Sequence, residues 1–118
     1  MEKILGIEEV EGLLSEIREK IQKYGLYFLK TKDKNRQTLA RLGIMADRVI
    51  EVIEDLRAED YCGGPDPDDK YAWRFVSVFG KQFDGIELYI KLSVSVWDEK
   101  VVCLSFHEAE RAMTYQFK

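Results

Sequence analysis

The sequence has 118 residues, of which 46% are apolar, and a formal net charge of −4. This length predicts a single domain over residues 1–118 with an ordinary hydrophobic core, and the negative charge argues against a protein that coats nucleic acid. No signal peptide follows Met1, and no apolar run approaches the roughly 20 residues of a membrane-spanning helix, so we expect a cytoplasmic protein without a membrane partner. Cys62 and Cys103 fit no metal-ligand spacing, and we expect two free thiols.

Charge is distributed unevenly along the chain. Residues 18–41 contain eight basic and two acidic side chains, a net charge of +6, whereas residues 47–69 contain nine acidic and two basic side chains, a net charge of −7. A protein polarised in this way can present a basic wall to a phosphate chain and still remain soluble. Two solvated helix faces of opposite sign explain the same pattern equally well.

Helical spacing of apolar residues occurs in three segments of the first half. In the first of them the apolar positions recur every three or four residues, and Gly25 can end the helix. Asp33 can cap the second helix, and Gly43 can end it. The predicted helices cover residues 7–24, 34 to about 42, and 46–58.

Two strands and a long loop are expected around these helices. Residues 26–31 are short, aromatic and β-prone, which favours a strand. Residues 59–70 are rich in glycine, proline and aspartate, and we expect them to form a polar loop. Residues 71–80 predict a strand whose bulkier, aromatic phase faces the core, so that Arg74 lies on the exposed face.

Residues 85–107 predict a β-hairpin. In its first strand apolar side chains occupy every second position over residues 86–96, which is typical of a strand with one buried face. The returning strand covers residues 101–107. Its expected core positions are Val102, Leu104 and Phe106.

Matching the apolar phases of the two hairpin strands sets their register. It places Lys91 opposite His107, with Tyr89 as a diagonal neighbour, and Arg74 joins them on the same exposed face. The only histidine of the chain then lies beside a tyrosine, a lysine and an arginine. Solvation of an exposed sheet face is the alternative explanation for these four polar residues.

Together, these four side chains suit RNA cleavage without a metal ion or cofactor. The 2′-hydroxyl attacks the adjacent phosphorus, which requires a base, an acid for the leaving oxygen, and cations that stabilise the added negative charge. His107 can serve as acid or base, since histidine changes its charge near neutral pH. Arg74 offers a bidentate fork to phosphate and Lys91 a point charge. Tyr89 can hydrogen-bond the phosphate or stack on a base.

The order of the predicted elements is helix, strand, two helices and three strands. It predicts an α+β fold in which a three-stranded antiparallel meander forms the C-terminal half. The early strand adds to one edge of this sheet, and the helices pack on one face.

Two short motifs lie within the predicted meander. Tyr89-x-Lys91 occupies its middle strand, and Ser105-Phe106 ends its last strand. With the surrounding segments, these motifs resemble the MqsR-type toxins of the RelE-like endoribonuclease group. The resemblance implies a RelE/MqsR-like fold and a bacterial type II toxin that cleaves mRNA without a metal and is neutralised by a co-expressed antitoxin. The resembling segments are residues 35–39, 56–61, 73–80, 87–92 and 102–107.

The resemblance also implies roles for individual residues. The active-site tyrosine of the family falls on Tyr89, and a basic residue that follows Ser-Phe falls on His107. Arg74 stands where family members can carry glutamine. Cys62 stands where a lysine can occur, and a thiol cannot supply the positive charge of that lysine.

We therefore expect an endoribonuclease toxin whose catalytic residues are His107, Tyr89, Arg74 and Lys91. Its expected partners are mRNA and a cognate antitoxin, for which a helix-turn-helix protein is a candidate. Two alternatives remain open, a non-catalytic protein-binding module and a RelE-like nuclease that acts only on ribosome-bound mRNA. The side chains expected to guide RNA, by an attraction that weakens with salt, are Lys30, Lys32, Lys34 and Arg36.

Overall fold

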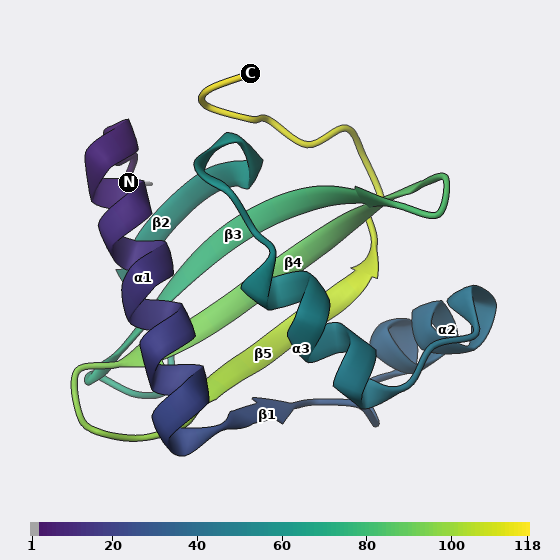
Figure 1. Ribbon diagram of the computed structural model, residues 1–118, viewed down its shortest axis with the longest axis horizontal. Coiled ribbons are helices and arrows are strands. Elements are labelled where there is room, and N and C mark those ends of the chain that lie inside the picture. The colour runs from purple at the N-terminus through teal and green to yellow at the C-terminus, as the bar shows by residue number, and fades with distance from the viewer. Residues whose placement is uncertain (1–2) are drawn as a thin grey trace.

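A computed structural model describes residues 3–118 of the chain. Within these residues three α-helices and one short 3-10 helix accompany a five-stranded sheet (Figure 1). The strand order across the sheet is β1-β5-β4-β3-β2. In chain order the elements are α1 (Ile7–Tyr24), β1 (Leu26–Phe28), α2 (Asp33–Leu42), α3 (Ala46–Glu54), η1 (Ala58–Asp60), β2 (Tyr61–Pro67), β3 (Arg74–Phe83), β4 (Ile86–Ser95) and β5 (Val101–Glu108).

The predicted α+β fold is confirmed. β3, β4 and β5 form the antiparallel meander, and β1 adds to its edge by pairing in parallel with β5. The helices lie close to their predicted bounds, although α3 ends at Glu54 and Asp33 is the first residue of α2 rather than its cap. Gly25 ends α1 with a φ of 93° and donates its backbone N–H to the carbonyl of Ile21.

α1 and α3 cross the same face of the sheet and enclose the core (Figure 1). The alternation predicted for the middle strand is confirmed up to Val94, because Leu88, Ile90 and Leu92 of β4 are fully buried beneath these helices. It is wrong for Val96, which lies beyond the end of β4 and is exposed. Burial of this many apolar side chains against one sheet face is the main contribution to the stability of the fold. The helix residues buried in this core are Val10, Leu14, Ile17 and Ile21 of α1 and Val49, Val52 and Ile53 of α3.

The prediction of a polar loop over residues 59–70 is wrong, because β2 forms there as an edge strand beside β3. Glycine and proline normally indicate a turn, but proline is tolerated in an edge strand, where its missing N–H is not needed for pairing. β2 is anchored by Tyr61, which is fully buried. The hydroxyl of Tyr61 accepts a hydrogen bond from the backbone N–H of Leu5 at 2.9 Å.

The predicted register of the hairpin is also wrong. Tyr89 lies opposite His107, Lys91 lies opposite Ser105, and the pairing then shifts so that Leu92 lies opposite Cys103. A β-bulge therefore inserts Leu104 into β5 without a partner on β4. As a result, β5 buries Val101, Cys103 and Phe106, whereas Val102 and Leu104 are only partly buried and line the opposite face.

Asn35 of α2 binds the backbone at the bulge. Its side chain is fully buried, donates hydrogen bonds to the carbonyls of Leu29 (3.0 Å) and Leu104 (3.2 Å), and accepts one from the backbone N–H of Phe106 (2.9 Å). The bulge interrupts the ladder to β4, and the amide of Asn35 provides hydrogen-bond partners for the backbone groups at the irregular position. A side chain of α2 thus bonds the irregular position of a strand about 70 residues further along the chain.

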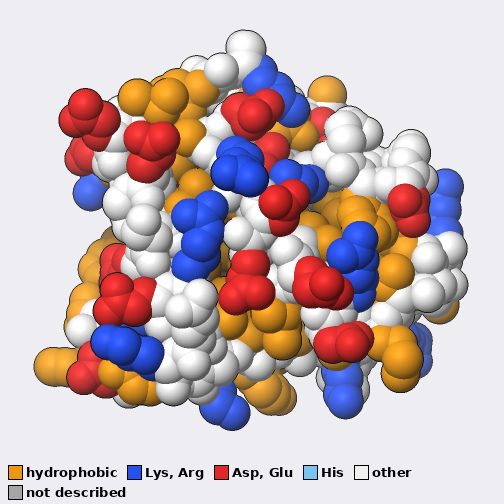
Figure 2. Space-filling view, in the orientation of Figure 1, with side chains coloured by type: hydrophobic (Ala, Val, Ile, Leu, Met, Phe, Trp, Pro, Cys, Tyr) orange, Lys and Arg blue, Asp and Glu red, His pale blue; other side chains and the backbone are white. Residues whose placement is uncertain are grey.

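Acidic and basic side chains are interspersed over the helix-covered face of the molecule (Figure 2). The pairs Lys20–Glu16 and Lys23–Glu19 on α1 are examples of the ion pairs that join them. Much of the net positive charge of residues 18–41 is therefore balanced locally. Among residues 3–118, no helix has the length and apolar character required to cross a bilayer.

Candidate functional site

The face of the sheet opposite α1 and α3 carries an open cleft of about 1420 Å³. Successive side chains of a strand point to opposite faces, so the strand that buries Leu88 and Ile90 presents Tyr89 and Lys91 to this cleft. All five strands and the segment after β5 contribute to its lining. Representative lining residues are Tyr27 of β1, Cys62 of β2, Arg74 of β3, Lys91 of β4, Leu104 of β5 and Met113 of the C-terminal segment.

The rings of Tyr89 and His107 are stacked at one end of this face. Their centroids lie 5.3 Å apart and their planes differ by 18°. The Nδ1 atom of His107 lies 2.9 Å from the carbonyl oxygen of Glu108. Because a carbonyl oxygen can only accept, this contact favours a proton on Nδ1 and leaves Nε2 of the neutral ring as the basic atom.

Lys91 follows Tyr89 by two residues on the same face of β4, which corresponds to roughly 7 Å along the strand. Among residues 3–118, its ammonium group has no hydrogen-bond or ion-pair partner. An unpaired ammonium in a cleft is available to an anionic ligand.

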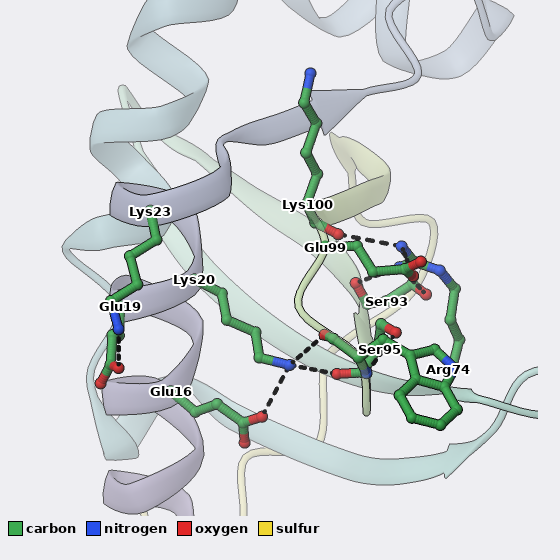
Figure 3. A network of polar contacts seen from close by, with 10 residues as sticks. Glu16, Glu19, Lys20, Lys23, Arg74, Ser93, Ser95, Glu99 and Lys100 are labelled. Atoms are coloured by element: carbon green, nitrogen blue, oxygen red, sulfur yellow. Dashed lines mark hydrogen bonds and ion pairs between the residues drawn. The ribbon is translucent and has the colours of Figure 1, made fainter.

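Arg74 lines the same cleft but lies at its other end. Gly80 is the residue of β3 opposite Tyr89, and Arg74 precedes it by six residues, or roughly 20 Å of strand. The guanidinium donates hydrogen bonds to the carbonyl and hydroxyl oxygens of Ser93, both at 3.2 Å, and to the carboxylate of Glu99 at 3.0 Å (Figure 3). The structure therefore brings Tyr89, Lys91 and His107 together. It places the guanidinium of Arg74 beside Ser93, two residues beyond Lys91 and four residues, or roughly 13 Å of strand, beyond Tyr89.

The four cations of residues 30–36 lie in different surroundings. Lys32 lines the cleft and donates to the carbonyl of Leu104 at 3.1 Å. Lys34 pairs with Glu110 at 2.8 Å, and this hydrogen bond lowers the pKa of the glutamate. Arg36 pairs with Asp33 at 2.9 Å, and Lys30 borders a separate, smaller pocket. Only Lys32 of the four is placed on the cleft.

Two further cations line the cleft, Lys70 and Arg111, and neither was predicted from the sequence. Neither belongs to a strand or helix, so no periodic pattern indicated where its side chain would lie. Within residues 3–118, Arg74 is the only cleft cation that has an acidic partner, whereas the other four have none. These four are Lys32, Lys70, Lys91 and Arg111.

Three aspartates also line the cleft, and two of them bind backbone amides. Asp68 accepts hydrogen bonds from the N–H groups of Lys70 (2.7 Å) and Tyr71 (3.3 Å), and Asp66 accepts one from the N–H of Lys3 (2.9 Å). These bonds fix the loop but leave the carboxylates charged. The lining contains five cations and three carboxylates, so the cleft has an excess of positive charge.

Cys62 also lines the cleft, at the position where the family resemblance places a lysine. Burial raises the pKa of its thiol to about 11, and the nearby carboxylate of Glu87 adds to the shift. A neutral thiol contributes no charge to the binding of an anion. Cys62 therefore does not replace the lysine.

We expect Cys62 to resist alkylation at neutral pH because the thiolate is the reactive species. Iodoacetamide at pH 7.5 should leave the native protein unmodified, whereas the unfolded chain should react at both cysteines. Mass spectrometry of the Cys103→Ser variant isolates the reaction of Cys62. Rapid modification of native Cys62 at this pH would show that the thiol is ionised.

A known protein family matches most of the chain. The family model described as "Motility quorum-sensing regulator, toxin of MqsA" matches residues 12–108, from α1 to the end of β5. This range includes Tyr89, Lys91 and His107. The chain has no significant match among curated proteins or solved structures. Because the model covers most of its length, the chain belongs to the MqsR family, a family of toxins of toxin–antitoxin systems.

Proposed function

We propose that this toxin is a metal-independent endoribonuclease that cleaves mRNA in the cleft opposite α1 and α3. The observation that carries the proposal is the stacked pair of Tyr89 and His107 beside the unpaired ammonium of Lys91. A proton-transfer group, a phenol and a cation then lie next to one another. The four unpaired cations of the cleft support a polyanionic substrate, because they attract phosphates along the length of the cleft.

In the proposed reaction the ribose 2′-oxygen forms a bond to the adjacent phosphorus, and the bond from phosphorus to the 5′-oxygen breaks. The products are a 2′,3′-cyclic phosphate and a free 5′-hydroxyl. One proton leaves the 2′-hydroxyl and one reaches the 5′-oxygen. Nε2 of His107 exchanges one of these protons, and the hydroxyl of Tyr89 is the neighbouring group that can carry the other.

Lys91 stabilises the pentacovalent phosphorane in this mechanism. The phosphorane carries more negative charge than the substrate phosphate, so a nearby ammonium lowers the energy of the transition state more than that of the ground state. Arg74 lies too far along the sheet to bind the same phosphate. We assign it to a neighbouring phosphate of the chain, and its ion pair with Glu99 holds it in place.

The decisive experiment incubates the purified protein with a synthetic single-stranded RNA in the presence of a chelator. We expect cleavage that yields 2′,3′-cyclic phosphate and 5′-hydroxyl ends, identified by mass spectrometry. Loss of cleavage on chelation would contradict a metal-independent reaction. If RNA is cleaved only after ribosomes are added, the protein is a ribosome-dependent nuclease. If neither condition gives cleavage, the non-catalytic binding module is supported instead.

Membership of this family also supports an antitoxin as the partner of the protein. We propose that the antitoxin prevents growth arrest when both proteins are produced in one cell. Co-expression with the product of a neighbouring gene, followed by co-purification, tests this partnership directly.

A further inference from the structure

An exposed pair of aromatic rings lies at the end of the cleft that is remote from His107. Tyr71 lines the cleft and is 46% exposed, and Trp73 beside it is 40% exposed. The two ring centroids are 5.3 Å apart, with 49° between their planes. Trp73 is not part of the cleft lining, so it supports Tyr71 from outside the cleft.

The loop that carries these rings is held by several hydrogen bonds. The Asp68 carboxylate accepts the N–H of Tyr71 at 3.3 Å, the N–H of Asp68 donates to the carbonyl of Arg74 at 3.0 Å, and the N–H of Arg74 donates to the carbonyl of Tyr71 at 3.0 Å. The carbonyl of Trp73 also accepts the N–H of Val96 at 2.9 Å, which ties the loop to the end of β4. These bonds fix the backbone that carries the ring, so the loop loses little backbone entropy when a ligand stacks on Tyr71.

Cations and carboxylates line the cleft together with the exposed ring, the carboxylates being those of Asp66, Asp68 and Asp69. Lys70 precedes Tyr71 in the chain, and Arg74 accompanies it in the cleft lining. Among residues 3–118 the ammonium of Lys70 has no ion-pair partner. An exposed aromatic ring in a cleft that also carries cations is an arrangement that binds single-stranded nucleic acid, since the ring stacks on a base while cations contact the adjoining phosphates.

We propose that Tyr71, supported by Trp73, is a stacking site for an unpaired base of the RNA, several nucleotides from the bond that is cleaved. This inference rests on the proposed function and extends it to the course of the substrate. The RNA runs along the sheet from the Tyr89–His107 pair, past Lys91, to Arg74 and Tyr71. The substrate class is single-stranded RNA, because the bases of a duplex are stacked within the helix and their faces cannot reach the ring.

Binding of an uncleavable RNA tests the stacking site. A fluorescein-labelled octanucleotide with 2′-O-methyl groups at every position lacks the attacking hydroxyl, and fluorescence anisotropy measures its dissociation constant. We expect Tyr71→Ala to raise this constant about tenfold and Tyr71→Phe to leave it within twofold of the wild-type value, because phenylalanine retains the ring. Circular dichroism verifies that both variants are folded.

Trp97 provides the matched control. It is another exposed aromatic residue (62%) at the same end of the sheet, but it does not line the cleft. Trp97→Ala should therefore leave the dissociation constant unchanged. In the Trp97→Phe background Trp73 is the only remaining tryptophan. Its fluorescence should then change on addition of the octanucleotide.

The outcomes distinguish this inference from the proposed function. Equal binding by Tyr71→Ala and the wild type, or an equal loss in Trp97→Ala, would overturn the stacking site, whether or not RNA is cleaved. The stacking site would also be overturned if Tyr71→Ala weakens the binding of an antitoxin but leaves the binding of RNA unchanged. If the octanucleotide binds through Tyr71 but no RNA is cleaved, the stacking site stands and the nuclease does not.

Discussion

Replacing His107 by alanine is expected to lower the rate of RNA cleavage by about 10²- to 10⁴-fold, the range typical for loss of a general acid or base. In the proposed reaction Nε2 of His107 exchanges a proton with the substrate, and alanine cannot. The effect should appear in kcat, measured with a synthetic RNA in the presence of a chelator. The dissociation constant of the uncleavable octanucleotide should change little, because the four unpaired cations of the cleft remain.

The control for this variant is Glu19→Ala. Glu19 is an exposed residue of α1 that pairs with Lys23 and does not line the cleft, so its loss should change kcat by less than about threefold. In cells, induced expression of the wild-type chain should arrest growth, and His107→Ala should relieve most of the arrest. Undiminished toxicity in a folded His107→Ala protein would remove the imidazole from the mechanism.

Replacing Asn35 by alanine is expected to lower the free energy of unfolding by about 2 kcal/mol, because a buried group left without a partner costs roughly 1–3 kcal/mol. The variant leaves the N–H of Phe106 without its partner. The carbonyls of Leu29 and Leu104 each lose one donor and keep another from Lys32, its backbone N–H at Leu29 and its ammonium at Leu104. Urea unfolding followed by circular dichroism measures the change. Asn35→Asp should also destabilise the protein, because a carboxylate would face the two carbonyl oxygens.

Gln37→Ala is the matched control on the same helix. Gln37 is exposed, so the loss of its side chain should change the stability by less than about 0.5 kcal/mol. At temperatures where Asn35→Ala remains folded, its cleavage rate should be lower than that of Gln37→Ala, because Asn35 stabilises the bulge that places His107 opposite Tyr89. An Asn35→Ala protein as stable as the control would show that the bulge does not depend on this amide.

Local patterns predicted several elements correctly. The spacing of apolar residues located α1, which packs its apolar side on the sheet as the helical period requires. Strict alternation located β4 and assigned Tyr89 and Lys91 to the face away from the core. These predictions succeeded because each depends only on neighbours a few residues apart.

β2 could not be predicted in the same way. Its glycines and prolines are typical of a turn, and the strand exists because Tyr61 is buried against the core and β3 provides a pairing edge. Both of these contacts join segments that are distant in the sequence. Lys70 and Arg111 were missed as cleft residues for a related reason, since their positions follow from β2 and from the segment after β5.

The sequence by itself determined the fold class, the family resemblance and the residue types available for catalysis. Local periodicity and short motifs depend only on residues that are close together in the sequence. Only the tertiary structure decided which of these residues meet. The amide of Asn35 supports the bulge that brings His107 opposite Tyr89, and the length of β3 separates Arg74 from that pair. A shift of one residue in register reverses the face of every following side chain. Such a shift depends on hydrogen bonds between segments that are distant in the sequence. A local sequence pattern does not predict these bonds.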